Sequence, residues 1–427
     1  MRYTIIGNGV AGVTAALKLR ERDTKAEITI IGGESEYFFS RTALMYTYMD
    51  QMELPALEPY ERKVYQKQSL RLVKDWVVDL DADAKSLKLK TGGSMKFDKL
   101  LLATGSVPNP VAWPGMEQVR DGVVNFVSLQ DLEACERLTP STRHAVVVGG
   151  GLIGIELVEC LRHHGVTVTF LVREPWYWPV ALDQEEATLI AGHIRDHGVD
   201  LRIREELVRV HADAAGRIQA VETKAGERIE CQMLGIAAGV KPGIDWLRGV
   251  TTPPELGRGI VTDPGFATSL PHVFAAGDCA EIRRSGDNPL IEQIWYSAKR
   301  QGELAAKAML GDTVDYHPPL FFNSSKFFEI EFTTVGQVMQ APADARHFFH
   351  QLQGKHVSIR IVSRENAVIG FNMLGSRWNH NVLERWIHER KTTGEVVAML
   401  HQAQFDVEFG RADLSGVESA WQMKGGK

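Results

Sequence analysis

Cysteine is scarce in this chain: the 427 residues include four, at positions 135, 160, 231 and 279. No two of them are spaced as C-x-x-C, so neither a disulfide framework nor a cysteine-based zinc site is expected. Packing in or near the core is the expected role of Cys135, Cys160 and Cys231. So few cysteines predict a reducing compartment and a cytoplasmic location.

Long apolar runs and basic clusters are also missing. No apolar run approaches about 18 residues, so no membrane span is expected. The 48 basic and 54 acidic residues give a net charge of −6 without a basic block, which argues against a nucleic-acid partner. The first predicted strand begins at residue 2, leaving no room for a signal peptide. The length allows two or three globular domains.

Glycines, by contrast, are regularly placed near the start of the chain. Gly7, Gly9 and Gly12 have the spacing G-x-G-x-x-G. Around them the apolar pattern predicts a strand, a helix and a second strand, over residues 3–6, 10–22 and 27–31. This order is the dinucleotide-binding fingerprint, and Glu34 follows the last glycine by about 20 residues, as that fingerprint requires.

Each position in the fingerprint has a physical reason. Gly7 permits the tight turn, Gly9 lets a pyrophosphate approach the backbone, and Gly12 lets the helix pack closely on the strand. The first helical residues, Val10 and Ala11, present unpaired N–H groups to the phosphates. The acid at position 34 is placed to accept hydrogen bonds from a ribose.

The same fingerprint occurs a second time. Gly149, Gly151 and Gly154 repeat the spacing. The predicted elements around them are a strand, a helix and a second strand, over residues 145–148, 152–163 and 166–172. Leu152 and Ile153 would present the N–H groups of this helix. Two fingerprints in one chain predict two bound nucleotides, one of which can pass electrons to the other.

The acid position of the second fingerprint is unusual. The residue at the tip of the second strand is Val172, and Arg173 and Glu174 follow it. Glu174 would favour NADH by bonding a ribose 2′-OH, whereas Arg173 would favour NADPH by meeting a 2′-phosphate. The sequence leaves both open.

Three further stretches carry candidate binding residues. A buried strand over 100–103 ends in Ala103, Thr104 and Gly105, and a later strand ends in Ala275-Ala276-Gly277-Asp278. The carboxylate there is well placed to hold a sugar-like hydroxyl. Gly239 stands before a predicted turn at 240–242, and Gln301 lies on a predicted helix over 294–310. The cofactor-binding set therefore includes Ala103, Thr104, Gly105, Gly239, Gly277, Asp278 and Gln301.

Aromatic residues gather in two places. The first group surrounds Arg41 and comprises Tyr37, Phe38, Phe39, Tyr46 and Tyr48. It forms either core packing or a wall beside a flat cofactor. The second group is Trp176, Tyr177 and Trp178, for which packing against the C-terminal region is favoured over a cleft or docking role.

The character of the chain changes at Pro318. Alternating strands are predicted to about residue 374, followed by amphipathic helices and a tail that is expected to be poorly ordered after Gly410. No nucleotide or metal fingerprint is found in this part. It is interpreted as an α+β module that caps the molecule or dimerises.

Together these motifs resemble the pyridine nucleotide-disulfide oxidoreductase superfamily. The resemblance rests on GNGVAG at 7–12, LLATG at 101–105, GGGLIGIE at 149–156, FAAGDCAE at 274–281 and the C-terminal SSKFFEIEFTTVG. It implies an α/β fold with two Rossmann-like domains and an α+β interface domain. The implied bounds are 1–121 with 251–317 for FAD, 122–250 for NAD(P)H, and 318–427 for the interface domain of a homodimer.

The disulfide branch of the superfamily carries redox cysteines in the helix after the second strand, and here that region has none. The segment GGESEYFFSR is instead similar to rubredoxin and ferredoxin reductases and to nitrite reductase flavin modules. That resemblance places Glu34 on the adenosine ribose and Arg41 near the cofactor. Tyr46 replaces the family lysine near the flavin, and Glu156 keeps the family acid near the nicotinamide. The alternative for Glu156 is a carboxylate favoured by the helix dipole.

The resemblance implies an NAD(P)H-dependent flavoprotein reductase. Hydride would pass from NAD(P)H to FAD, with catalytic roles for Glu156 and Tyr46. The electrons would then go to a small rubredoxin-like or ferredoxin-like iron–sulfur protein, or to another acceptor. Backbone groups of Gln301 and Gly302 would help to stabilise the reduced flavin. The alternatives are an NADH oxidase or peroxidase, and an NADH-responsive switch that controls a partner. No metal is expected.

Overall fold

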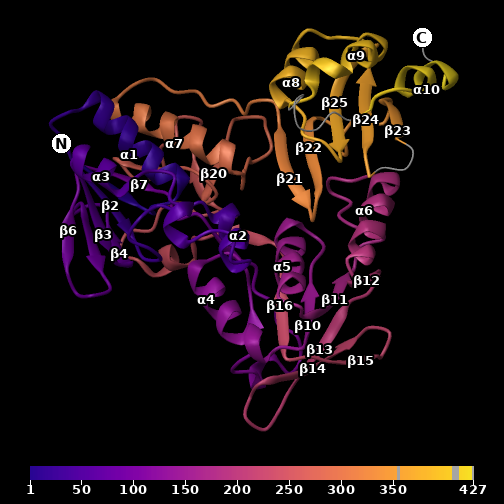
Figure 1. Cartoon of the computed structure of the whole chain (residues 1–427). Coiled ribbons are helices and arrows are strands. Elements are labelled where there is room, and N and C mark those ends of the chain that lie inside the picture. Colours follow the sequence, from indigo (N-terminus) through magenta and orange to yellow (C-terminus); the bar gives the residue numbers. More distant parts are fainter. Residues whose placement is uncertain (353–355, 406–412, 426–427) are drawn as a thin grey trace. The chain divides into compact units, whose positions relative to one another are not determined.

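The computed structural model describes residues 1–352, 356–405 and 413–425 (Figure 1). Their contacts divide the chain into two compact units. Unit 1 comprises residues 1–111, 125–137 and 238–318, and unit 2 comprises 112–124, 138–237 and 319–427. The C-terminal region thus groups with the middle of the chain, while the three domain bounds given above stay a prediction.

Unit 1 is built on a five-stranded parallel sheet in the order β19-β7-β1-β2-β3. The helix α1 links β1 to β2, and a connection of this length is what two parallel strands require. The strands are β1 (Arg2–Ile6), β2 (Glu27–Gly32), β3 (Leu70–Lys74), β7 (Lys99–Leu102) and β19 (Val273–Ala275), and the helix is α1 (Val10–Arg22). The predicted strand–helix–strand order is confirmed.

Smaller elements complete unit 1. An antiparallel three-stranded sheet, β4-β5-β6, turns at residues 90–93, as the alternation there predicts. The long helix α7 packs on α1 in a shared core. The bounds are α2 (Leu44–Tyr48), α3 (Arg62–Lys67), β4 (Val77–Asp81), β5 (Ser86–Leu89), β6 (Ser94–Lys96), β8 (Ser106–Pro108), α4 (Leu129–Leu138), β17 (Val240–Pro242), β18 (Ile260–Thr262), β20 (Ala280–Ile282) and α7 (Trp295–Leu310).

One prediction for unit 1 is wrong. Residues 240–242 form the strand β17, which pairs antiparallel with β8, where a turn was expected. The segment is only three residues long, which is too short to show the alternation of apolar and polar residues that predicts a strand. Its partner strand β8 lies more than 130 positions away in the sequence, so the residues around β17 do not indicate the pairing.

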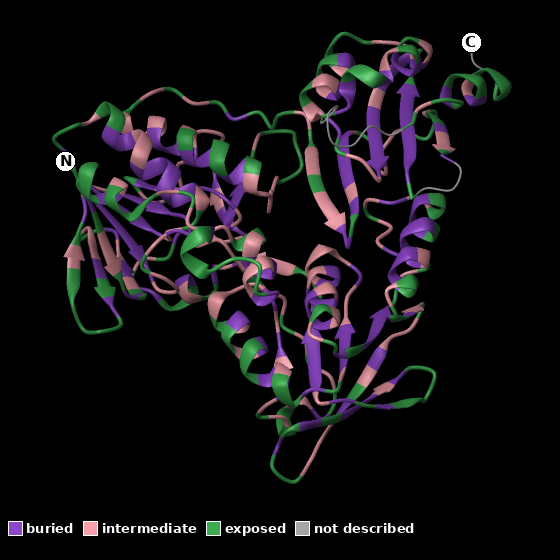
Figure 2. Cartoon of the chain, in the orientation of Figure 1, coloured by how far each residue is buried: buried purple, intermediate pink, exposed green. Residues whose placement is uncertain are grey.

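Unit 2 contains a second five-stranded parallel sheet, in the order β12-β11-β10-β16-β9. Its central strands β10, β11 and β16, like β1, β2 and β7 of the first sheet, are buried over most of their length (Figure 2). An antiparallel sheet, β13-β14-β15, adjoins it in sequence. The bounds are β9 (Val123–Val124), β10 (His144–Val148), α5 (Leu152–His163), β11 (Thr167–Val172), α6 (Gln184–Asp196), β12 (Asp200–Ile203), β13 (Leu207–Ala212), β14 (Ile218–Thr223), β15 (Arg228–Glu230) and β16 (Met233–Ile236).

The C-terminal part of unit 2 is an antiparallel sheet in the order β21-β22-β25-β24-β23, covered by helices, as predicted. The expected disorder after Gly410 is wrong for residues 413–425, because α10 packs Val417 and Ala420 into this core. Residues 411–412 and 426–427, on which the same expectation falls, lie outside the described ranges. The bounds are β21 (Phe322–Phe327), β22 (Ile330–Gly336), β23 (Arg346–Gln351), β24 (Ser358–Arg364), β25 (Ala367–Leu374), α8 (His380–His388), α9 (Thr393–Met399) and α10 (Val417–Met423).

A buried ion-pair cluster ties the start of α6 to β24. Arg360, with 2% of its side chain exposed, lies 3.2 Å from Asp183, 2.9 Å from Glu185 and 3.0 Å from Glu186. A buried charge is tolerated only when it is paired in this way. Across the described ranges, no helix is long and apolar enough to cross a membrane.

The contact between α1 and α7 depends on small residues. A Cβ atom on Gly302 would lie 2.3 Å from the carbonyl oxygen of Ala11, which is closer than any real contact. Ala15, Ala16 and Ala305 are fully buried in the same core. The face of α1 that carries these small residues is therefore the face that α7 covers.

We expect Gly302→Ala to lower the free energy of unfolding by about 1–3 kcal/mol, because the methyl group has to push two backbones apart. The matched control is Gly192→Ala on α6, where a Cβ atom meets nothing within 4 Å among the described residues. That change should be neutral or stabilise by up to about 1 kcal/mol through helix propensity. Urea denaturation of the full chain measures both, and equal stability of the two variants would contradict the close contact.

Candidate functional site

The first glycine fingerprint adopts the predicted geometry. Gly7 has a φ of +111°, and a Cβ atom there would lie 2.0 Å from the carbonyl oxygen of Ala103. A Cβ atom on Gly12 would lie 2.0 Å from the carbonyl oxygen of Gly7. Around Gly9, by contrast, a Cβ atom meets no described atom within 4 Å. Two glycines are thus required by packing, and the middle one faces open space.

The N-terminus of α1 is open to an anion. Gly9 is the N-cap residue and has no side chain to accept from the first N–H groups, and no acid stands in the first turn. Val10 and Ala11 therefore begin the helix with backbone donors that need an acceptor. Together with the positive end of the helix dipole, these donors suit a phosphate group.

The second fingerprint repeats this arrangement in unit 2. Gly149 has a φ of +111°, and a Cβ atom on Gly154 would lie 2.0 Å from its carbonyl oxygen. Gly151 is the N-cap of α5, faces open space among the described residues, and leaves the first turn without an acid. Leu152 and Ile153 supply the first backbone donors. Both helix starts therefore fit a pyrophosphate.

Glu34 follows β2 and is held in place by two partners. Its carboxylate accepts hydrogen bonds from the Arg41 guanidinium, at 3.0 and 2.6 Å, and from the Leu129 backbone N–H at 2.9 Å. A carboxylate has about four acceptor positions, so lone pairs remain for a ribose. Arg41 thus lies beside Glu34. Its expected place near the cofactor stays a prediction.

Asp278 follows β19, as predicted. Its carboxylate accepts a hydrogen bond of 2.5 Å from the Ser106 hydroxyl, and burial raises its pKa above the usual value. The preceding Gly277 has a φ of +80°, and its N–H donates to the Gln301 side chain at 2.8 Å. Gln301 is 1% exposed and donates in turn to Glu292 at 3.0 Å. It therefore holds the turn that carries the aspartate.

The expected role of the Gln301 and Gly302 backbone does not fit. Both residues lie in the middle of α7, where each backbone N–H donates to the carbonyl one turn before. They therefore have no free donor for a reduced flavin, and Gly302 instead provides the close contact with α1.

The segment after β7 is fixed by bonds to the region around β17. The Thr104 hydroxyl donates to the Gly243 carbonyl at 3.0 Å, and Gly105 has a φ of +68°. Gly239, with a φ of +84°, accepts from the backbone N–H of Asn109 at 3.0 Å. Ala103, Thr104 and Gly105 therefore lie at the carboxyl end of the first sheet, where ligands bind in open α/β folds.

At the tip of β11 the two candidate residues for the second ribose pair with each other. Arg173 lies 3.1 Å from the Glu174 carboxylate, and their side chains are 75% and 33% exposed. Among the described residues, no third group fixes either side chain in the way that the Leu129 N–H fixes Glu34. This exposed pair leaves the choice between NADH and NADPH open.

The two predicted catalytic residues lie in different units. Tyr46 is half-buried on α2. Glu156 is in the second turn of α5, beyond the first turn on which the helix dipole acts most strongly. Burial and the nearby Glu159 carboxylate raise the pKa of Glu156 to about 8, despite Lys326. The carboxyl group therefore carries its proton at neutral pH.

Most of the first aromatic group packs in the core. Phe38, Phe39 and Tyr48 are buried, and Phe38 stacks on Trp295 with ring centroids 5.5 Å apart. The Arg41 guanidinium lies over the Phe39 ring at 5.2 Å. Core packing, one of the two alternatives, is confirmed for these buried rings.

The second aromatic group packs as predicted. Tyr177 is 1% exposed and meets Phe327 edge to face at 5.9 Å. Trp178 contacts the Phe327 and Phe332 rings, each at 5.7 Å. These rings join the end of β11 to the C-terminal sheet.

The four cysteines are free and buried. Burial raises the pKa of Cys135 and Cys231 to about 12, and burial also raises that of Cys279. A thiol rather than a reactive thiolate is therefore present at neutral pH. The expected packing role is confirmed for Cys135, Cys160 and Cys231.

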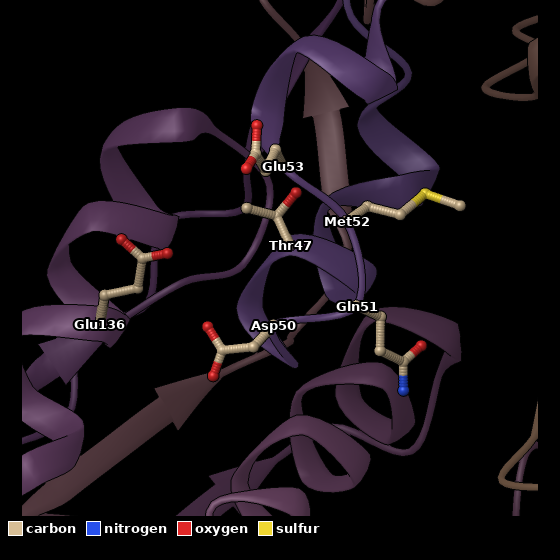
Figure 3. A pocket seen from close by; sticks show the side chains of 6 residues that line it. All are labelled: Thr47, Asp50, Gln51, Met52, Glu53 and Glu136. Carbon is tan, nitrogen blue, oxygen red and sulfur yellow. The ribbon is translucent and has the colours of Figure 1, made fainter.

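A pocket of about 320 Å³ lies beside α2 and α4, but it is not the dinucleotide site. Figure 3 shows the side chains that line it, three of which are carboxylates, Asp50, Glu53 and Glu136. These charges would repel phosphates. The functional candidates are instead the open helix starts at Gly9 and Gly151.

Three residues of the site were missed in the sequence. Asn8 donates from its amide to the Ser35 carbonyl at 2.8 Å, Ser106 holds Asp278, and Glu292 accepts from Gln301 and Ser297. The position of Asn8 between the first two glycines of the fingerprint was the one feature of the sequence that could have indicated its role. Ser106 acts across 172 positions, whereas Glu292 bonds to side chains five and nine positions further along the chain.

The pKa of Glu156 predicts a pH-dependent stability. Between about pH 5 and 8 the folded chain keeps a proton that the unfolded chain releases, so stability falls by up to about 1.4 kcal/mol per pH unit. Glu156→Gln cannot ionise and should gain stability over the wild type as the pH rises through this window. Urea denaturation at several pH values measures the gain.

The control is Glu133→Gln, which removes an exposed carboxylate on α4. Its stability difference from the wild type should stay constant with pH. A constant difference for Glu156→Gln as well would contradict the raised pKa.

Comparison with known proteins agrees with this geometry. The chain is 25% identical over 398 residues to a nitrite reductase [NAD(P)H] of Bacillus subtilis, covering 92% of this chain and 48% of that protein. It is 29% identical over 314 residues to the ferredoxin–NAD(+) reductase component of a biphenyl dioxygenase system of Paraburkholderia xenovorans, covering 73% and 75%. The chain thus spans about half the length of that nitrite reductase.

Solved structures show the same fold. A ferredoxin reductase of Rhodopseudomonas palustris superposes with a TM-score of 0.82 at 22% identity, covering 96% of this chain and 98% of that one. The family model for pyridine nucleotide-disulphide oxidoreductases matches residues 1–309, which include both glycine fingerprints. This chain therefore belongs to the pyridine nucleotide-disulphide oxidoreductase family.

Proposed function

We propose that the chain is an FAD-dependent NAD(P)H:acceptor oxidoreductase. The observation that carries the proposal is the pair of open helix starts, at Gly9 and Gly151, each free of caps and of acids in its first turn. Each fits the pyrophosphate of one dinucleotide. Two dinucleotide sites in one chain are what hydride transfer between a nicotinamide and a flavin requires.

In this proposal unit 1 binds FAD. The backbone donors of Val10 and Ala11 hold its pyrophosphate, and Glu34, oriented by Arg41, accepts from the adenosine ribose. Asp278 holds a hydroxyl of the sugar-like chain, with Ser106 donating to its carboxylate. These acceptors and donors match a ligand that carries both phosphates and hydroxyls.

Unit 2 binds NAD(P)H in the same proposal. The donors of Leu152 and Ile153 hold its pyrophosphate, and the pair Arg173–Glu174 meets the adenosine ribose. Glutamate suits a 2′-OH, and arginine suits a 2′-phosphate. Glu156 carries a proton at neutral pH and can donate a hydrogen bond from its carboxyl group toward the nicotinamide end.

When bound, FAD supplies a two-electron acceptor for hydride and can release electrons singly or in pairs. The chain's own contribution is to bind, orient and exclude water. The resemblance to ferredoxin reductases implies a lysine beside the flavin at the place of Tyr46, and we propose that Tyr46 borders the flavin instead.

The electrons leave without a thiol intermediate. All four cysteines are buried, and the two with pKa values near 12 are poor nucleophiles. We therefore propose direct transfer from the flavin to a small iron–sulfur protein, which the relative named as a ferredoxin–NAD(+) reductase component supports. A cytoplasmic location and a homodimer belong to the same proposal; the four free thiols support the first.

The acceptor test uses anaerobic purified protein with NADH or NADPH. We expect flavin bleaching on addition of reduced nicotinamide, and rapid re-oxidation by a [2Fe–2S] ferredoxin or by the dye ferricyanide, with slow re-oxidation by oxygen. Stopped-flow absorbance measures each rate. Fast peroxide or water formation would favour an oxidase, and reduction without any acceptor but with a change of oligomeric state would favour a switch.

A pair of matched variants separates the two nucleotide sites. Gly9 and Gly151 both have extended backbone that valine can adopt, and both face open space, so Gly9→Val and Gly151→Val should fold. Gly9→Val should be purified without flavin, because the side chain fills the pyrophosphate's place. Gly151→Val should keep its flavin and react normally after reduction by dithionite, yet lose at least about 100-fold in kcat/KM for NAD(P)H, about 2.7 kcal/mol.

The flavin-to-protein ratio and the rate of reduction by NADH are the two measurements. A Gly9→Val protein that still binds flavin would contradict the proposal that unit 1 binds FAD. An unchanged rate of reduction of Gly151→Val by NADH would contradict the proposal that unit 2 binds NAD(P)H.

A further inference from the structure

Two histidines and a glutamate meet at the end of α6, away from both glycine fingerprints. His193 and His197 are four residues apart and so lie on one face of the helix, with ring centroids 4.5 Å apart. Glu329 stands in the tight turn between β21 and β22. Its Oε2 atom lies 3.1 Å from Nε2 of His193 and 3.0 Å from Nε2 of His197. One ligand atom from each residue thus falls within 4.8 Å of the others.

The hydrogen bonds of His197 leave room for a cation. Its Nδ1 atom lies 2.9 Å from the carbonyl oxygen of His193, which can only accept, so this nitrogen carries the hydrogen. The Nε2 atom of the same ring then faces the Glu329 carboxylate, which is also an acceptor. Two acceptors attract each other only with a proton or a metal cation between them. Metal-binding histidines are usually oriented by a hydrogen bond of this kind, from the second ring nitrogen to a backbone carbonyl.

The surroundings fix the two rings in place. Phe328 stacks on His197 with centroids 4.0 Å apart and planes 19° apart, and His193 is 7% exposed. The ring of His356 lies 4.7 Å from that of His193. The Glu329 side chain is 74% exposed, so solvent reaches the group from one side. The ligands are thus pre-positioned and an entry path is present.

The donor set favours a transition metal such as zinc or iron(II), of which zinc is the simpler candidate because it has no redox chemistry. Two imidazole nitrogens and one carboxylate suit zinc, whereas calcium and magnesium take oxygen ligands. Ligand atoms about 2.1 Å from a tetrahedral zinc ion lie about 3.4 Å apart, so the observed 3.0 and 3.1 Å need a shift of a few tenths of an ångström.

We propose that His193, His197 and Glu329 bind one Zn²⁺ ion, with a water molecule in the fourth position. The ion would join α6 to the β21–β22 turn. Arg360 already ties the start of α6 to β24 of the same C-terminal sheet. Zinc would hold the other end of the helix to that sheet, so that both ends of α6 are fixed.

The test uses the full chain with its flavin, without an affinity tag, after dialysis against a chelator. Zn²⁺ is titrated in competition with a chromophoric chelator. We expect one zinc ion per chain with a Kd of about 10 µM or tighter. His197→Gln and Glu329→Gln should each weaken binding at least about tenfold. Zinc should also raise the Tm of the wild type and not that of the two variants.

The matched control is His211→Gln. His211 on β13 lies 3.4 Å from Glu222 on β14, and this pair belongs to no group of three candidate ligands among the described residues. This variant should bind zinc as the wild type does. Circular dichroism and flavin content check that each variant folds. A wild type that binds no zinc at about 10 µM, or variants that bind it equally well, would overturn the proposal.

Discussion

The constraint on which the rest of this molecule depends is the contact between a helix and the strand before it. In each parallel sheet the last glycine of the fingerprint faces the carbonyl oxygen of the first, at a place where a Cβ atom would lie 2.0 Å away. Only glycine at positions 12 and 154 allows that approach. The approach then fixes the helix start at the carboxyl end of the sheet, with its backbone donors open. Two independent copies of one packing rule thus create two open helix starts of the kind that suits a phosphate.

The two sites differ in how firmly the ribose position is held. In unit 1 the acid is locked, because Glu34 accepts from both Arg41 and the Leu129 backbone. In unit 2 the pair Arg173–Glu174 is exposed and bonded only to itself in the described structure. A locked acceptor suits a cofactor that stays bound through many turnovers. An exposed pair that can rearrange suits a substrate that enters and leaves in every cycle.

The sequence predicted the elements that obey local rules. α1 and α5 begin and end at the predicted residues, because glycine caps and the helical period both report on neighbours within a few positions. It failed where the partner is distant. β17 exists through its pairing with β8, and α10 through burial in the C-terminal core. Ser106 meets Asp278, and His193 meets Glu329, across more than 130 positions. A single sequence carries no trace of such meetings.

The acids of α5 complete the logic of the second site. Glu156 and Glu159 follow the open helix start by one and two turns, and two negative charges there would oppose a dinucleotide. The structure removes both: burial keeps the proton on Glu156, and Lys326 from β21 pairs with Glu159. The positive end of the helix therefore acts on the phosphates without opposition from its own side chains. Because the lysine comes from the C-terminal sheet, that sheet contributes to the electrostatics around the helix α5.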